Sequence, residues 1–204
     1  MKFKTILTVA FLAAVFNTQA QNISIGPSVG FQHSWISSEL PDSTSNTIHP
    51  GFNGGVSLVY STESHLGLGA DLKYSTEGTS VKTEFQNVQT VTDWNTSYIR
   101  LPIRLIYFLG EYGHAIRPKI FLGPTLGVLL SSKSEDVDVK EFTNGFDFGV
   151  HGGVGLNIRL MERIWLNTDV TYTQGLSDVT VSDFDDSKNH NGNIALNAGL
   201  LFGF

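Results

Sequence analysis

The sequence of 204 residues contains no cysteine. Disulfide bonds, thiolate metal sites, cysteine nucleophiles and a lipidated-cysteine anchor are therefore excluded. Charged residues are also scarce, at 16% against roughly 25% in soluble globular proteins. The net charge of -6 argues against a basic surface, and without one we expect no nucleic-acid partner.

Apolar runs long enough to cross a membrane as a helix, about 20 residues, do not occur in the sequence. A shorter apolar run at 6–16 follows Lys2 and Lys4 and precedes a small-x-small motif at 18–20. This order is typical of a secretory signal peptide, which we place at residues 1–20. The remaining chain, beginning at Gln21, would then be exported.

Helical periodicity is missing after residue 20. Large apolar residues instead alternate with small or polar ones in eight segments, a pattern that predicts strands with one apolar face. The segments are 22–35, 52–61, 66–75, 99–107, 120–131, 147–159, 166–173 and 193–204. Their polar face is mainly Gly, Ser, Asn and Thr, whereas a sheet face in contact with water would usually be rich in Lys and Glu.

The number and length of these segments predict the fold class. Strands of about ten residues, even in number, suit a tilted passage across a membrane. Small residues fit the narrow lumen of an eight-stranded barrel, and a bilayer tolerates no open sheet edge. We therefore predict that residues 21–204 form one all-β domain. It would be a closed eight-stranded antiparallel transmembrane β-barrel of up-and-down topology, in contact with outer-membrane lipid and lipopolysaccharide.

The connections between segments alternate in length. The long polar ones are 36–50, 76–97, 132–145 and 177–192, and the shorter ones are 61–65, 110–117 and 160–163. Long external loops and short periplasmic turns are the rule for outer-membrane barrels, so we expect both chain ends in the periplasm. Candidates for the aromatic belts at the membrane surfaces are Trp35, Tyr60, Tyr74, Tyr107, Tyr172, Phe202 and Phe204.

Two motifs lie near the centre of the chain: Tyr98, Leu101 and Pro102, followed by Gly123, Pro124 and Gly127. In this order they resemble the PorT-type outer-membrane β-barrel family of the Bacteroidetes. The segments 146–149 and 171–176 are similar to two further strand motifs of that family, although Thr171 stands where the family has Arg. The resemblance implies an outer-membrane barrel. Some relatives assist type IX protein secretion, which implies a secretion-system or other periplasmic partner.

The last residues continue the alternation and end in Phe202 and Phe204. This ending resembles the signal read by the barrel-assembly machinery. The resemblance implies that machinery as a partner during biogenesis.

Charged residues on the polar face would line the lumen. They are Asp71, Lys73, Arg100, Arg104, Asp147, His151, Arg159 and Asp169. Because buried charges need partners, we expect a network that joins the two arginines to Asp71 or Asp147. Such a network would fill the narrow lumen as a plug of salt bridges. The alternative is a gate, or a path for protons or ions.

Three prolines fall within strand segments. They are Pro27, Pro102 and Pro124. Proline removes a hydrogen-bond donor from the ladder and is found at edges or bulges. In a closed barrel we expect a β-bulge at each.

The histidines carry no H-E-x-x-H or other ligand spacing. A barrel enzyme would need a histidine beside a serine or an aspartate. The pairs available are His33 with Ser34 and His190 with Asp185. Neither has a supporting motif, so we expect no catalytic residue and no cofactor.

Two acidic clusters occur in the long connections. They are Glu135, Asp136 and Asp138, and then Asp183, Asp185 and Asp186. Divalent-cation binding is conceivable, but Lys188 occupies the glycine position of the D-x-[DN]-x-[DN]-G loop. We interpret these residues as solvated loop charge and expect no metal site.

The sequence therefore favours a small, non-catalytic outer-membrane barrel with a structural or accessory role. Three alternatives remain open: a barrel enzyme acting on outer-membrane lipid, a conducting pore, and a soluble periplasmic lipocalin-like binder. The last would require the large apolar face to point into the barrel.

Overall fold

A computed structural model describes residues 23–37, 44–85, 88–181 and 188–204. The expected signal peptide at 1–20 lies outside these ranges, as do Asp183, Asp185 and Asp186. The strands are β1 (Ile23–Ser37), β2 (Thr44–Thr47), β3 (His49–Ser61), β4 (Leu66–Phe85), β5 (Val88–Phe108), β6 (Ile116–Ser134), β7 (Val137–Asp138), β8 (Phe146–Met161), β9 (Ile164–Gly175) and β10 (His190–Gly203). A 3-10 helix, η2, spans Lys140–Phe142. None of the described segments is a helix with the length and hydropathy to cross a membrane.

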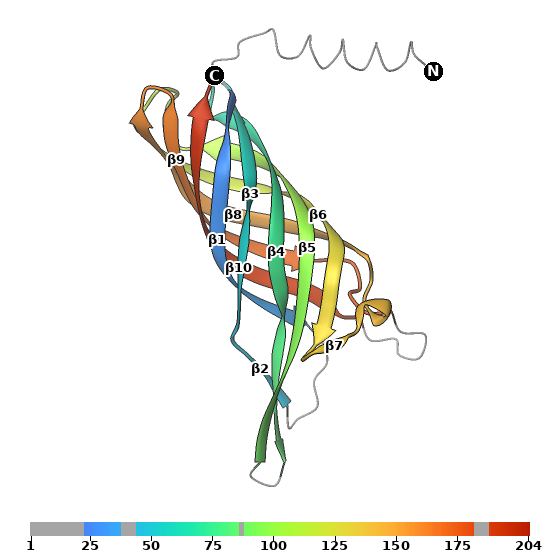
Figure 1. Ribbon diagram of the computed structural model, residues 1–204. Helices are drawn as coiled ribbons and strands as arrows, with labels where there is room; N and C mark the ends of the chain where they lie inside the picture. The colour runs from blue at the N-terminus through green and yellow to red at the C-terminus, as the bar shows by residue number, and fades with distance from the viewer. Residues whose placement is uncertain (1–22, 38–43, 86–87, 182–187) are drawn as a thin grey trace, which may run out of the picture.

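Eight strands pair edge to edge into a closed ring (Figure 1). Around the ring the order is β1, β3, β4, β5, β6, β8, β9 and β10, and β10 pairs with β1 again. All neighbours are antiparallel, and each barrel strand lies beside the one that follows it in the chain. The predicted closed, eight-stranded, up-and-down barrel is confirmed.

The two ends of the barrel differ. At one end the strands are joined by the connections 62–65, 109–115 and 162–163, and β1 begins where β10 finishes. We call this the short-turn end, which is uppermost in Figure 1. The opposite end, where the remaining connections lie, is the long-loop end.

The expectation of a polar loop at 76–97 is wrong. β4 and β5 continue through this region as a paired ribbon that projects beyond the ring (Figure 1). β-branched residues such as Val81, Thr83 and Val91 alternate here with polar ones, and such residues favour strands. β2 pairs with β4 within the connection 36–50, and β7 and η2 occupy the connection 132–145. Regular structure therefore extends into the long-loop end.

The barrel has its large apolar side chains on the outer surface and its polar side chains in the lumen. Phe31 and Leu122 are 67% and 66% exposed, whereas Asp71 and Arg100 are 2% and 5% exposed. In all eight segments the outward face is the apolar face that the alternation predicted. Such a distribution suits a barrel surrounded by lipid. The lipocalin-like alternative is wrong, because the large apolar side chains point away from the lumen.

The structure contradicts the β-bulges that we expected at Pro27, Pro102 and Pro124. Between β5 and β6, Pro102 pairs with Thr125, and pairing resumes at Leu105 with Leu122 in the same register. The β1–β10 ladder passes Pro27 in the same way. Proline lacks one N–H donor. The ladder therefore loses backbone hydrogen bonds beside each proline, but no extra residue is inserted to form a bulge.

Aromatic side chains gather toward both ends of the outer surface. Near the long-loop end, the ring centroids of Trp35 and Tyr172 lie 6.0 Å apart. Tyr107 and Phe202 are exposed near the short-turn end, where β5 and β10 finish. Two aromatic belts separated by aliphatic side chains match the two interfaces of a bilayer.

The lipid-facing surface can be tested at Leu122, which lies in the middle part of β6. We expect Leu122→Arg to lower the free energy of unfolding by about 2–4 kcal/mol in lipid vesicles, because a cation near the bilayer centre is costly. Urea unfolding in phosphatidylcholine vesicles measures this change, with Leu122→Val as the matched control. Equal stability of the two variants would contradict a lipid-facing Leu122.

Candidate functional site

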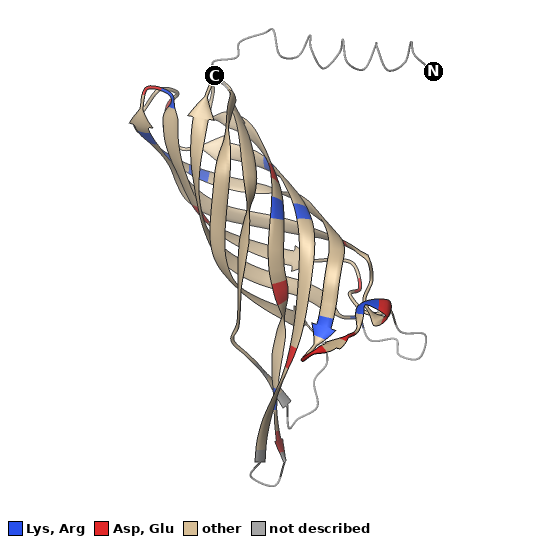
Figure 2. Cartoon of the chain, in the orientation of Figure 1, with Lys and Arg blue, Asp and Glu red and all other residues tan. Residues whose placement is uncertain are grey.

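The lumen is the largest gathering of polar side chains in the described barrel. Figure 2 shows that charged residues occur at a few positions along the barrel strands and at the two ends of the barrel. Each of the eight ring strands contributes a buried polar side chain to one connected group, which we call the lumenal network. In strand order these are Gln32, Asn53, Asp71, Arg100, Lys119, Asp147, Asp169 and Asn197.

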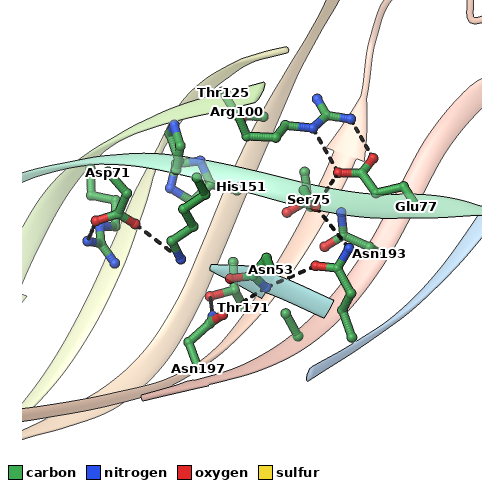
Figure 3. Close-up of a pocket in the computed structure, with 16 residues that line it drawn as sticks. Asn53, Asp71, Ser75, Glu77, Arg100, Thr125, His151, Thr171, Asn193 and Asn197 are labelled. Carbon is green, nitrogen blue, oxygen red and sulfur yellow. Dashed lines mark hydrogen bonds and ion pairs between the residues drawn. The ribbon is translucent and has the colours of Figure 1, made fainter. Parts of the chain in front are cut away.

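Arg100 is the centre of the first half of the lumenal network. Its Nε and Nη2 donate to the two carboxylate oxygens of Glu77, at 2.8 and 2.5 Å (Figure 3). Its Nη1 donates to Asp147 at 2.5 Å. Ser75 and Ser177 donate to these carboxylates at 2.8 and 2.6 Å. A guanidinium held by two carboxylates and further hydrogen bonds is a rigid, compensated charge.

Arg104 is the centre of the second half. Its Nη2 donates to Asp71 at 2.5 Å, and its Nη1 lies 3.6 Å from Asp169. Lys73 lies 3.3 Å from Asp71, and Lys119 lies 3.3 Å from Asp169. Lys119 also donates to Asn167. Each cation in this group therefore has a carboxylate partner.

Neutral amides connect the two halves. Gln32 donates to Ser75 at 2.9 Å, and Asn53 donates to Gln32 at 3.0 Å and to Asn197 at 3.1 Å (Figure 3). Asn197 in turn donates to Asp169 at 2.8 Å. A continuous chain of hydrogen bonds thus runs from the Arg100 group to the Arg104 group across the lumen.

The lumenal network is electrically balanced and leaves little space. Its carboxylates are Asp71, Glu77, Asp147 and Asp169, and its cations are Lys73, Arg100, Arg104 and Lys119. The cavity among these side chains has a volume of about 50 Å³. That is room for a few water molecules and not for a larger solute.

An apolar cluster lies beyond the network, toward the short-turn end. Its buried members are Val59, Ile106, Phe108, Phe121 and Leu201, with Trp165 packed against them. Phe121 contacts the cations of the network: the guanidinium of Arg104 lies 5.5 Å from its ring centroid. The lumen is therefore closed first by paired charges and then by an apolar layer.

Two of the charged residues named from the sequence have no ion pair in the network. His151 is buried, but neither ring nitrogen hydrogen-bonds to a described residue. Arg159 is exposed at the rim of the short-turn end, where its guanidinium lies 5.9 Å from the Trp165 ring centroid. Their position on the polar face was therefore insufficient to predict pairing.

Sequence reasoning missed Glu77 and Lys119, both essential to the geometry. Glu77 lies in 76–97, where the sequence predicts a polar loop and the structure has paired strands. Lys119 directly precedes the segment 120–131 and has the parity of its polar face. Extending that alternation by one residue would have found it.

Two of the six motif residues named from the sequence, Tyr98 and Gly127, pack against Arg100. Tyr98 is fully buried, and the guanidinium of Arg100 lies 4.5 Å from its ring centroid. A Cβ at Gly127 would lie 2.7 Å from Nη1 of Arg100. A larger residue at that position would displace the guanidinium from its present place between the two carboxylates. Leu101 and Pro124 point outward instead.

The proposed histidine pairs do not form catalytic arrangements. Nδ1 of His33 accepts the backbone N–H of His49 at 3.1 Å, and His190 contacts a backbone carbonyl of Ser177. Asp185 lies outside the described residues. The structure instead brings together His49, Ser80 and Asp93, which the sequence did not suggest.

This His49 cluster departs from a Ser-His-Asp triad. Ser80 donates its hydroxyl proton to Asp93 at 2.5 Å, so the 2.9 Å contact with Nδ1 of His49 uses the serine oxygen as acceptor. In a triad the serine donates to the imidazole. Ser80 and His49 are also buried. The arrangement joins β3, β4 and β5 beyond the ring and does not activate a nucleophile.

The acidic residues of the described long loops do not gather into one site. Glu135, Asp136 and Asp138 are exposed, and no described group of three His, Cys, Asp or Glu side chains has the arrangement of a metal site.

Asp178, in the connection between β9 and β10, accepts the N–H groups of Thr180 and Asn189 at 3.0 and 3.2 Å. Burial acts to raise the pKa of Asp178, but these hydrogen bonds outweigh it and hold the pKa below its ordinary value.

Comparison with known proteins identifies the family. The family model described as outer membrane protein beta-barrel domain matches residues 19–181, most of the chain. The chain belongs to this family. Its closed ring, lipid-facing apolar surface and polar lumen are those of a protein of the outer membrane.

Two solved structures share the fold of this outer-membrane barrel. Neisserial surface protein A (NspA) is 17% identical, with 90% of this chain and 97% of that chain covered and a TM-score of 0.56. OprG from Pseudomonas aeruginosa is 14% identical, with 89% and 95% covered and a TM-score of 0.57. No curated protein sequence matches the chain significantly. At these identities the likeness concerns the fold.

The lumenal network can be tested at Arg100. We expect Arg100→Ala to lower the free energy of unfolding by about 3–5 kcal/mol, because it leaves buried carboxylates without their cation. Urea unfolding of the refolded barrel in vesicles measures the loss. Lys133→Ala, an exposed cation at the far end of β6, should change stability little. An Arg100→Ala variant as stable as wild type would contradict a stabilising network.

Proposed function

We propose that this outer-membrane barrel is a non-catalytic protein with a structural or accessory role, rather than a pore or a lipid enzyme. The observation that carries the proposal is the balanced lumenal network, whose eight charged side chains fill the barrel and pair with one another. Narrow eight-stranded barrels of this kind hold side chains in place of a channel. A solute path would have to break several buried ion pairs.

The arrangement of polar groups also supports a non-catalytic role. Ser80 is buried and already donates its proton to Asp93. A nucleophile for lipid hydrolysis needs a base that takes its proton and an approach for the substrate. Neither requirement is met at the His49 cluster.

We further propose the orientation of the barrel. The long-loop end would face the cell exterior and the short-turn end the periplasm, as is the rule for outer-membrane barrels. The start of β1 and the end of β10 share the short-turn end, which fits an exported chain whose signal peptide at 1–20 has been removed. The ribbon of β4 and β5 would then project outward, beyond the lipopolysaccharide-bearing surface.

A finer role follows from the motif resemblance. Tyr98, Gly127 and their neighbours resemble the PorT-type barrels of the Bacteroidetes, some of which assist protein secretion. On this basis we propose a secretion-system or periplasmic partner. The barrel-assembly machinery would read the ending at Phe202 and Phe204, whose side chains are exposed on the outer surface.

The orientation can be tested because the chain contains no cysteine. Thr92→Cys places a thiol on the projecting ribbon, and Glu162→Cys places one in the short β8–β9 turn; both positions are exposed. A membrane-impermeant maleimide should label the Thr92→Cys variant on intact cells. It should label the Glu162→Cys variant only after the outer membrane is permeabilised. The reverse pattern would overturn the orientation.

The accessory role in secretion is tested in a deletion strain. If the barrel assists secretion, the culture medium of the strain should contain clearly less of the cargo proteins of that system, and plasmid-borne wild type should restore them. Outer-membrane protein profiles provide the control for general envelope damage. Normal export in the deletion strain would reject the secretion role while leaving the structural role in place.

A further inference from the structure

Arg117 differs from every other buried cation of the described barrel. It lies at the start of β6, at the short-turn end, and is 2% exposed. Arg100, Arg104 and Lys119 each pair with a carboxylate, whereas Arg117 has no ion pair with a described residue. A buried charge without a counter-ion is costly. The guanidinium of Arg117 is therefore expected to bind an anionic partner.

The protein contacts of Arg117 position the guanidinium without saturating it. Its ring neighbour is Phe108, with the guanidinium carbon 3.9 Å from the ring centroid. Nε and Nη2 approach the carbonyl oxygens of Gly110 and Ser64 at 3.4 and 3.5 Å, longer than ordinary hydrogen bonds. A guanidinium has five N–H donors. The two contacts use Nε and Nη2, and Nη1 forms no hydrogen bond with a described residue.

Arg117 faces a cavity at the short-turn end, which we call the mouth cavity. Its volume is about 290 Å³. Arg159 and Arg163 line it with Arg117, and Asn157, whose side-chain oxygen is buried and has no hydrogen bond to a described residue, lies opposite Arg117 in the ladder. Glu162 is the lining side chain of opposite charge, and it forms no ion pair with these arginines. Positive charge therefore predominates among the lining side chains.

We propose that the mouth cavity binds a phosphate group. Planar guanidinium groups bind phosphate oxygens through paired N–H donors, and here three of them come from two strands and a turn around one cavity. The volume exceeds that of a single phosphate, so part of the molecule carrying the phosphate would enter as well. That molecule is either a soluble phosphate compound or a phospholipid headgroup. The proposal concerns the purified barrel and does not depend on its orientation or on a secretion role.

The first experiment uses the refolded, full-length exported chain in an uncharged maltoside detergent. Sodium phosphate is titrated by calorimetry, with sodium chloride at matched ionic strength as reference. A second readout is the fluorescence of Trp165 at the cavity wall, recorded in a Trp35→Phe, Trp94→Phe background. We expect saturable binding that Arg117→Gln weakens by about tenfold or more, since a charge-assisted pair is lost. Lys133→Gln, at the opposite end of the same strand, should bind as wild type does.

The second experiment separates the two sources of phosphate. The barrel is reconstituted with phosphatidylglycerol, purified in maltoside, and the lipid that remains bound is measured by native mass spectrometry. Retention by wild type but not by Arg117→Gln, without binding of free phosphate, would identify a lipid headgroup. Arg117-dependent binding of free phosphate without retained lipid would identify a soluble compound, and binding of both would support a phosphate site open to either source. No Arg117-dependent binding in either experiment would overturn the proposal.

A variant that fails to fold would show no heat-dependent band shift on SDS gels. Should Arg117→Gln fail this check, the double variant Arg159→Gln and Arg163→Gln replaces it, because both side chains are exposed at the rim. We expect this double variant to fold and to lose most of the binding. Unchanged affinity in the folded double variant would also overturn the proposal.

Discussion

The closure of the backbone hydrogen-bond ladder is the constraint on which the rest of the structure depends. Inside a bilayer no water is available to the N–H and C=O groups of an edge strand, so a sheet can cross only as a ring. In this chain the ring closes where β1 meets β10, from Ser24 beside Gly203 to Ser37 beside His190. Closing with eight strands fixes a narrow lumen. The composition of both faces follows from that geometry.

A narrow lumen limits what the inward face can hold. Many inward positions are glycine, serine, threonine or asparagine, and most of the charged side chains at the other inward positions are paired. Arg100 fits only because Tyr98 flanks it and Gly127 provides space. The outward face has no such limit and carries the large apolar side chains. The packing of one guanidinium thus accounts for two of the motif residues, Tyr98 and Gly127.

Period-two alternation was sufficient to predict the ring and the direction of each strand face, because one face meets lipid and the other a polar lumen. It is insufficient for the ribbon of β4 and β5, where both faces are largely polar and the sequence predicts a loop. The sequence indicates Asp71 and Asp147 as carboxylates for the two arginines, but not which arginine pairs with which, and it does not indicate Glu77. Arg100 selects Glu77 and Asp147, whereas Arg104 selects Asp71. These choices depend on strand stagger around the ring, which alternation along single strands does not contain. The prolines were misjudged for a related reason, since a lost donor did not shift the register.

The lumenal network also bears on the order in which the barrel is assembled. The contacts of Arg100 with Glu77 and of Arg104 with Asp71 join residues 23 and 33 positions apart, within the single β4–β5 hairpin. The contact of Asn53 with Asn197 spans 144 positions and requires the finished ring. Local contacts form faster than distant ones. The hairpin can therefore pair Arg100 and Arg104 with carboxylates while the seam is still open. β6, β8 and β9 then bring the remaining charges, Lys119, Asp147 and Asp169. Such an order would spare the growing barrel from carrying bare charges into the membrane.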